Sequence, residues 1–98
     1  MKILALERQL PGVIDERLRP YLKEEAFTVW DLLQQGVLRE IYFREDARQA
    51  VLILECVDGH EAQQILATLP LVREGSIAFE IVPLAPYPGF SRLFAPDF

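Results

Sequence analysis

The chain has 98 residues, a length typical of one domain with a single hydrophobic core. Its formal net charge is −5, with acidic and basic residues mixed along the chain, which argues against nucleic acid or an anionic membrane as the main partner. One cysteine and one histidine, Cys56 and His60, exclude an internal disulfide and a recognisable Cys/His metal cluster, so we expect no metal and no cofactor.

The N-terminal segment shows no targeting signal. It reads MKILALERQLPG, and Glu7 and Arg8 interrupt its apolar stretch too early for a signal peptide. No apolar run in the chain approaches 18 residues, the length that a membrane span needs. We therefore expect a cytoplasmic protein with no membrane partner.

The first third of the chain predicts a strand and a helix. Residues 2 to 9 are typical of a strand, and Asp15 is the predicted N-cap of a helix that runs to about Gln35, with Gly36 after its end. Pro20 predicts a bend about one turn into this helix, or a later start. The apolar stripe of the helix has helical spacing and comprises Leu18, Leu22, Ala26, Val29, Trp30 and Leu33.

The remainder predicts a hairpin, a second helix and a last strand. Residues 37 to 44 and 49 to 57 are strand-like and are joined by a short polar segment. Asp58 and Glu61 have the spacing of a helix-capping pair, and the apolar stripe of the helix that follows ends at Pro70. Residues 77 to 84 predict the fourth strand.

The order β-α-β-β-α-β predicts a ferredoxin-like α+β fold, in which both helices cover one face of an antiparallel four-stranded sheet. We assign residues 1–84 to this domain and residues 85–98 to a C-terminal arm. The arm is rich in proline and in large apolar side chains, which need a surface beyond a two-helix domain. We expect the arm to contact a neighbouring subunit through Tyr87, Phe90, Leu93, Phe94 and Phe98.

The alternation of side chains along the strands predicts two unlike faces of the sheet. We expect the helices to cover the more apolar set: Leu4, Leu6, Val37, Ile41, Phe43, Leu52, Leu54, Cys56, Ile77, Phe79 and Ile81. The second set mixes aliphatic residues with carboxylates: Ile3, Ala5, Glu7, Leu38, Glu40, Tyr42, Val51, Ile53, Glu55, Ala78, Glu80 and Val82. This second face is too apolar to be left in water, so we expect a second copy to pack on it as a two-fold homodimer or part of a higher homo-oligomer.

Two segments resemble the muconolactone isomerase family. Residues 66–88, LATLPLVREGSIAFEIVPLAPYP, are similar to its leucine-proline-leucine turn, acidic strand and proline-containing tail. Residues 34–43, QQGVLREIYF, resemble its glycine-containing helix end and arginine-bearing strand. The resemblance implies a dimeric α/β barrel, C-terminal arms exchanged between subunits, and a cofactor-free proton shift in an unsaturated lactone. The chain departs from the family pattern at Glu40, where a histidine is expected.

Glu40, Tyr42 and Arg39 form the predicted active site. A carboxylate in an apolar pocket can take a proton from a carbon next to a carbonyl, which makes Glu40 the candidate base and Tyr42 a hydrogen-bond donor. Arg39 can hold a substrate carboxylate, although strand neighbours share a pocket only where a bulge intervenes. The alternative is that Glu40 forms an ordinary ion pair across the sheet or the dimer seam.

Other candidates are weaker. Glu7 shares the predicted second face with Glu40 and can contribute to substrate binding, and paired carboxylates there would raise each other's pKa. The alternative is that the glutamates of this face are simply solvated. Trp30 and Phe27 can line a pocket for a planar ligand, or belong to the core. We expect His60 at the surface and Cys56 to be buried as a small apolar residue.

These patterns favour a cofactor-independent proton-shift enzyme, similar to muconolactone isomerase, that acts on a small lactone or carboxylated molecule. Two alternatives stay open. One is a non-catalytic module that binds a small ligand or serves assembly. The other is a cofactor-free oxygenase, which would need a roomier apolar pocket.

Overall fold

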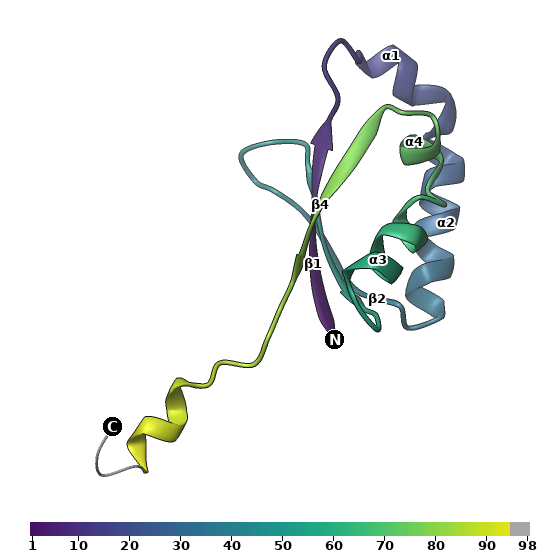
Figure 1. Ribbon diagram of the computed structural model, residues 1–98. Helices are drawn as coiled ribbons and strands as arrows, with labels where there is room; N and C mark the ends of the chain where they lie inside the picture. Colours follow the sequence, from purple (N-terminus) through teal and green to yellow (C-terminus); the bar gives the residue numbers. More distant parts are fainter. Residues whose placement is uncertain (95–98) are drawn as a thin grey trace.

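The computed structural model describes residues 1–94 and has a four-stranded antiparallel sheet in the order β2-β3-β1-β4 (Figure 1). Phe98 lies outside the described residues. Within residues 1–94, no helix is long and apolar enough to cross a bilayer. The elements follow one another as β1 Lys2–Gln9, α1 Asp15–Leu18, the 3-10 helix η1 Arg19–Tyr21, α2 Leu22–Gln34, β2 Leu38–Phe43, β3 Ala50–Glu55, α3 Gly59–Leu66, α4 Pro70–Arg73, β4 Ile77–Pro83 and the 3-10 helix η2 Gly89–Leu93.

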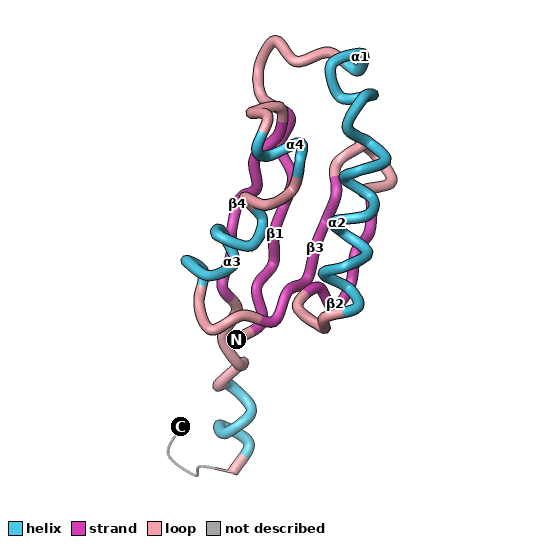
Figure 2. The backbone as a smooth tube through the Cα atoms, turned by 90° about the vertical axis from the view of Figure 1, so that its right-hand side faces the viewer, coloured by secondary structure: helices cyan, strands magenta, loops and turns pink. Residues whose placement is uncertain are grey.

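The helices lie on one face of the sheet, and no helix of the described chain covers the other face (Figure 1 and Figure 2). This arrangement confirms the predicted ferredoxin-like α+β fold. Both sheet edges, β2 and β4, are unpaired on their outer sides within the described chain.

The first predicted helix is divided at Pro20. Because proline lacks an N–H and clashes with the preceding turn, the chain passes through η1 before α2 begins. Asp15 is the first residue of α1, not its N-cap: Ile14 holds the cap position and no side chain caps the helix. Gly36 has a φ of 78°, which only glycine adopts without strain, and it follows the end of α2 as predicted.

The second helical region is also in two parts. The Asp58 carboxylate accepts the N–H of Glu61 at 2.8 Å, which confirms the predicted cap of α3. α3 ends at Leu66, however, and Pro70 begins α4 where a helix end was predicted. Leu69, the residue before the proline, is extended, and a proline at the first helical position loses no hydrogen bond.

β1 is turned over relative to the prediction. It pairs with β3 so that Ile3 lies opposite Leu54 and Ala5 opposite Leu52, and all four are buried. The predicted placement of Ile3, Ala5 and Glu7 on the open face is therefore wrong, as is that of Leu4 and Leu6 under the helices. β1 has apolar residues on both of its sides, so its sequence does not show which side faces the core. An error of one residue in the assignment exchanges its two faces.

Leu38 was also assigned to the wrong face. It lies opposite Leu54 and is buried in the core. The register of β2 shifts between Leu38 and Glu40, and this bulge makes Arg39 the extra residue. After the bulge, Glu40 and Tyr42 face the open side, opposite Ile53 and Val51, as predicted.

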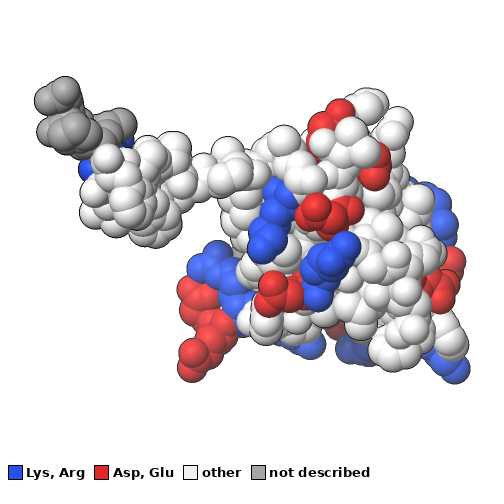
Figure 3. Space-filling view, turned by 90° about the horizontal axis from the view of Figure 1, so that it is seen from below, with Lys and Arg blue, Asp and Glu red and all other residues white. Residues whose placement is uncertain are grey.

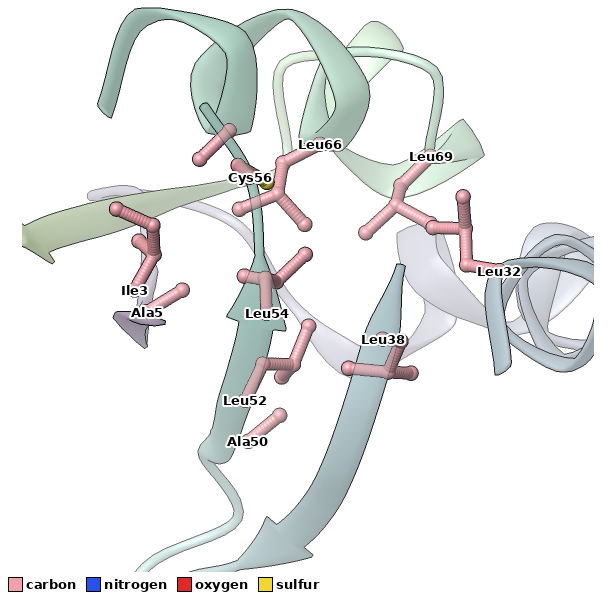
Figure 4. Close-up of a cluster of buried hydrophobic side chains, with 11 residues drawn as sticks. Ile3, Ala5, Leu32, Leu38, Ala50, Leu52, Leu54, Cys56, Leu66 and Leu69 are labelled. Atoms are coloured by element: carbon pink, nitrogen blue, oxygen red, sulfur yellow. The ribbon is translucent and has the colours of Figure 1, made fainter. Parts of the chain in front are cut away.

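The core lies between the sheet and the helix layer, and its side chains come from β1, β2, β3, α2, α3 and the loop before α4 (Figure 4). The apolar stripe predicted for the first helix contributes only in part. Val29 and Leu33 pack against the core, but Leu22, Ala26 and Trp30 are exposed. The buried members are Ile3, Ala5, Leu32, Leu38, Ala50, Leu52, Leu54, Cys56, Ala62, Leu66 and Leu69.

The C-terminal arm projects away from the body (Figure 1). It leaves where the N–H of Leu84 donates to the carbonyl oxygen of Lys2 at 2.9 Å, and it accounts for the long axis of a molecule that measures 60 × 29 × 22 Å. The arm contains η2, and in the described structure its large apolar side chains are exposed. Its contact with a neighbouring subunit stays a prediction.

Candidate functional site

A cavity of about 240 Å³ lies where β1 and β3 separate. The two strands pair from Lys2 to Leu6, but β1 continues along β4 as far as Gln9. β3 does not extend along this end of β1, because the chain before Ala50 belongs to the β2–β3 hairpin. That hairpin is closed by a hydrogen bond from the N–H of Arg44 to the carbonyl oxygen of Gln49. The cavity is lined by Leu6, Glu7, Arg8, Arg44, Gln49, Ala50 and Glu80.

Glu7 occupies the split between the strands. Ala50 lies one residue beyond the last β1–β3 pair, and its backbone N–H donates to the side-chain Oε1 of Glu7 at 3.2 Å. Burial raises the pKa of the Glu7 carboxyl, and the hydrogen bond from Ala50 opposes this only in part. A carboxyl group with a raised pKa is better suited to accept and return a proton near neutral pH.

Two arginines also line the cavity. Arg8 pairs with Glu80, which lies diagonally across from it on β4. Arg44 donates from Nε and Nη2 to the two oxygens of Asp46, at 2.8 and 2.6 Å, and this hydrogen bond lowers the pKa of Asp46. Each guanidinium group is thus held by a carboxylate partner in the lining of the cavity. Such an arrangement can bind an anionic group close to an acid or base.

A second carboxylate, Glu25 of α2, lies within electrostatic reach of Glu7. Its Oε1 accepts the N–H of Leu71, the second residue of α4, at 3.0 Å. Burial raises the pKa of Glu25, and the negative charge of Glu7 raises it further. The sequence reasoning did not identify Glu25. Its signal is spacing: it precedes Val29 and Leu32 by four and seven residues, so it belongs to the inward side of α2.

Replacing Glu25 with Gln should change how stability depends on pH. A carboxyl whose pKa is raised on folding favours the folded state most when it is protonated, and this contribution is lost as pH rises through the folded-state pKa. Glutamine still accepts the Leu71 N–H. We therefore expect the free energy of unfolding of Glu25→Gln, relative to wild type, to increase in urea titrations as pH rises above the ordinary glutamate value of 4.5. The exposed Glu45→Gln variant is the control, and a relative stability that falls or stays constant would contradict the burial of Glu25.

Glu40, Tyr42 and Arg39 lie on or near the open side of the edge strand β2. Tyr42 donates to Oε1 of Glu40 at 2.8 Å, and this hydrogen bond raises the pKa of Tyr42. The bulge at Arg39 interrupts the alternation of side chains along β2, so Arg39 could share a face with Glu40. Its guanidinium instead donates a hydrogen bond to the carbonyl oxygen of Gly36. All three side chains are exposed, and none lines the cavity beside Glu7. The structure therefore separates Glu7 from the candidate residues with which it was grouped.

The other candidates have separate locations. Trp30 is 57% exposed and lines a groove on the outer side of α2 together with Phe27, so the interpretation as core is wrong for both residues. Glu55 pairs with the N-terminal amine at 3.3 Å. His60 is exposed, as predicted. Cys56 is buried, also as predicted, and burial raises the pKa of its thiol.

No three His, Cys, Asp or Glu side chains converge within residues 1–94 in a way that could hold a metal ion. The charged groups of the described surface are interspersed in sign in the view of Figure 3, as their mixed order in the sequence predicts.

Comparison with known proteins establishes the fold. No protein-family model and no curated protein sequence match the chain. A crystal structure of muconolactone isomerase aligns with a TM-score of 0.73 at 15% identity, over 91% of this chain and 93% of that one. The structure of 5-chloro-2-hydroxyhydroquinone dehydrochlorinase (TftG) from Burkholderia phenoliruptrix AC1100, in complex with 2,5-dihydroxybenzoquinone, aligns with a TM-score of 0.68 at 15% identity, over 89% and 96%. The resemblance inferred from residues 34–43 and 66–88 is thus confirmed at the level of the fold.

Proposed function

We propose that the protein is a cofactor-independent proton-shift enzyme of the muconolactone isomerase type, acting on a small lactone or carboxylated substrate. The observation that carries this proposal is Glu7: a half-buried carboxyl of raised pKa that lines a cavity next to Arg8 and Arg44. The similarity of fold to muconolactone isomerase supports the reaction class.

In this proposal Glu7 takes a proton from the γ carbon of the unsaturated lactone, which is acidified because the double bond conjugates it with the carbonyl. The electron pair of the broken C–H bond delocalises through the double bond onto the carbonyl oxygen as a dienolate, and Glu7 returns the proton to the carbon next to the carbonyl. The double bond migrates, and no oxidant or reductant is needed. Arg8 and Arg44 bind the substrate carboxylate or the developing negative charge.

Glu40 is the second candidate base. The hydrogen bond from Tyr42 at 2.8 Å orients its carboxylate and provides a donor next to it, and Arg39 is the associated candidate for substrate binding. None of these three residues lines the cavity that contains Glu7. They would therefore form a substrate site only if another surface covered β2.

A non-catalytic small-ligand-binding module is the second candidate function. It would bind a neutral ligand without proton transfer, because Arg8 and Arg44 already have carboxylate partners and need not bind an anionic group. The functional test is turnover of muconolactone and simpler butenolide carboxylates, followed by proton NMR with EDTA present. Double-bond migration above the protein-free rate supports the enzyme. Ligand binding without migration contradicts it and supports the module, and oxygen-dependent substrate loss would indicate an oxygenase.

We also propose that a second copy covers the open face of the sheet. The strand pairing places five apolar side chains on this open face, and each is half-buried in a single chain: Leu4, Leu6, Val51, Ile53 and Val82. A two-fold pairing of these faces would remove a contiguous apolar patch from water.

The variant Ile53→Lys tests this assembly. Ile53 lies at the centre of the open face, opposite both Leu4 and Glu40. A lysine there should abolish the dimer seen by light scattering and leave the circular dichroism of the chain intact, because the helix-side core is untouched. Glu45→Lys in the exposed hairpin is the control. A wild-type monomer, or a dimer that Ile53→Lys leaves unchanged, would refute this interface.

A further inference from the structure

A second cavity, larger than the one beside Glu7, plays no part in the proposed function. It has a volume of about 410 Å³ and lies between α3 and the edge strand β4, and α4 closes one end of it. Figure 2 shows α3 and α4 over this half of the sheet and α2 over the other half. The two cavities have no lining residue in common.

The cavity lies at a break in the helix layer. Gly59, the first residue of α3, packs closely against the C-terminal end of β4. α3 then ends at Leu66, and α4 begins only at Pro70. Ala67 and Val72 line the cavity from either side of this break. The middle of β4 is therefore incompletely covered, and its side chains form one wall of the cavity.

The lining is uncharged and has an apolar part and a polar part. No Lys, Arg, Asp or Glu belongs to it, although these residues make up 26% of the chain. The polar part is one side of α3, where His60, Gln63 and Gln64 follow one another at helical spacing. The apolar part comes from the end of α3, α4 and β4, and its large members are Leu66, Val72, Phe79 and Ile81.

The polar side chains of the lining are not used by the protein itself. Within residues 1–94, the side chains of His60, Gln63 and Gln64 make no hydrogen bond to the chain. The nearby Thr68, which does not line the cavity, instead donates its hydroxyl to the carbonyl oxygen of Ile65 at 2.6 Å. Each glutamine amide offers both donors and an acceptor, so α3 presents unused hydrogen-bonding groups beside an apolar wall.

We infer that this cavity binds a small uncharged molecule with an apolar ring and one or two hydrogen-bonding groups. The ring lies against Phe79, Val72 and Ile81, and the polar groups face Gln63 and Gln64. The volume is within the range of about 300–1,000 Å³ that is typical of small-molecule sites. An anion would lose its hydration there and find no arginine or lysine in the lining, so the site disfavours carboxylates.

A matched pair of probes tests this inference. 2-Naphthol is uncharged at neutral pH, and 2-naphthoate has the same ring system with a negative charge. Each is titrated into the full-length protein labelled with nitrogen-15, and the backbone amide signals of Gln64 and Phe79 are followed by NMR. We expect 2-naphthol to shift both signals saturably and to bind at least about tenfold more tightly than 2-naphthoate.

Variants locate the binding. Ala67→Phe places a ring in the cavity from an exposed position, so it should weaken 2-naphthol binding by at least about tenfold and leave the fold intact. Thr68→Phe adds the same ring one residue further along, outside the lining, and should leave binding unchanged. Gln63→Ala/Gln64→Ala removes the polar groups without adding bulk and should weaken binding by about threefold or more.

The inference is independent of the function proposed for Glu7. Glu7→Gln should bind 2-naphthol as wild type does, whether or not Glu7 transfers protons, because Glu7 is not in this lining. Three results would overturn the inference: no saturable shift at Gln64 and Phe79 up to the solubility limit of 2-naphthol, 2-naphthoate bound as tightly as 2-naphthol, or Ala67→Phe and Thr68→Phe with the same affinity.

Discussion

Glu7→Gln is expected to lower kcat for double-bond migration by about 10²–10⁴-fold, the usual contribution of a positioned general base. The fold should survive, because glutamine retains an oxygen that can accept the Ala50 N–H. Loss of kcat with intact circular dichroism would place the proton transfer at Glu7. The measurement is steady-state kinetics on the best substrate from the butenolide series.

Glu40→Gln is the matched comparison. It removes the other candidate base, whose Oε1 accepts the hydrogen bond from Tyr42. If Glu7 is the base, Glu40→Gln should change kcat by less than about tenfold. The reverse pattern, a large loss in Glu40→Gln and normal turnover in Glu7→Gln, would move the chemistry to β2 and contradict the role of the cavity.

Leu54→Ala is expected to cost about 2–5 kcal/mol of the free energy of unfolding. Leu54 is completely buried and faces Ile3 and Leu38 on the neighbouring strands, so truncation leaves a cavity that the flanking strands cannot close. Urea unfolding monitored by circular dichroism measures the loss.

Ile53→Ala, at the adjacent position of β3, is the control for this assignment of faces. Ile53 points to the open side and is only half-buried in one chain. At concentrations where the chain is monomeric it should cost clearly less than Leu54→Ala. An equal or larger cost would show that the helix-side face has been misassigned.

The contrast between β1 and β3 shows what the sequence could predict. β3 and β4 each carry a glutamate, Glu55 and Glu80, among their apolar residues, and these charges mark the open side, so the alternation was assigned correctly. Lys2 to Leu6 in β1 has apolar residues on both sides, and only the pairing with β3 shows that Ile3 and Ala5 face the core. Local patterns predict strands, but the face of an apolar strand depends on its partners.

The candidate site was less accessible to prediction for the same reason. The cavity beside Glu7 exists because β3 starts at Ala50 while β1 continues to Gln9, which is a matter of register between distant segments. Glu25 reaches the same region from α2 and was overlooked among the charged residues of that helix. Helical spacing left Trp30 either in the core or lining a pocket, and only the structure shows that it is exposed on the outer side of α2.

Glu7, as we propose, is a proton-transfer group of raised pKa inside a ligand site. Carbon-13 NMR titration of the glutamate carboxyl groups tests this role most directly, with Glu7→Gln identifying the Glu7 resonance. We expect this resonance to titrate above the ordinary glutamate value of 4.5 and to shift when muconolactone or a butenolide carboxylate is added. A Glu7 resonance that titrates at or below 4.5 and does not respond to these ligands would show that Glu7 has no such role.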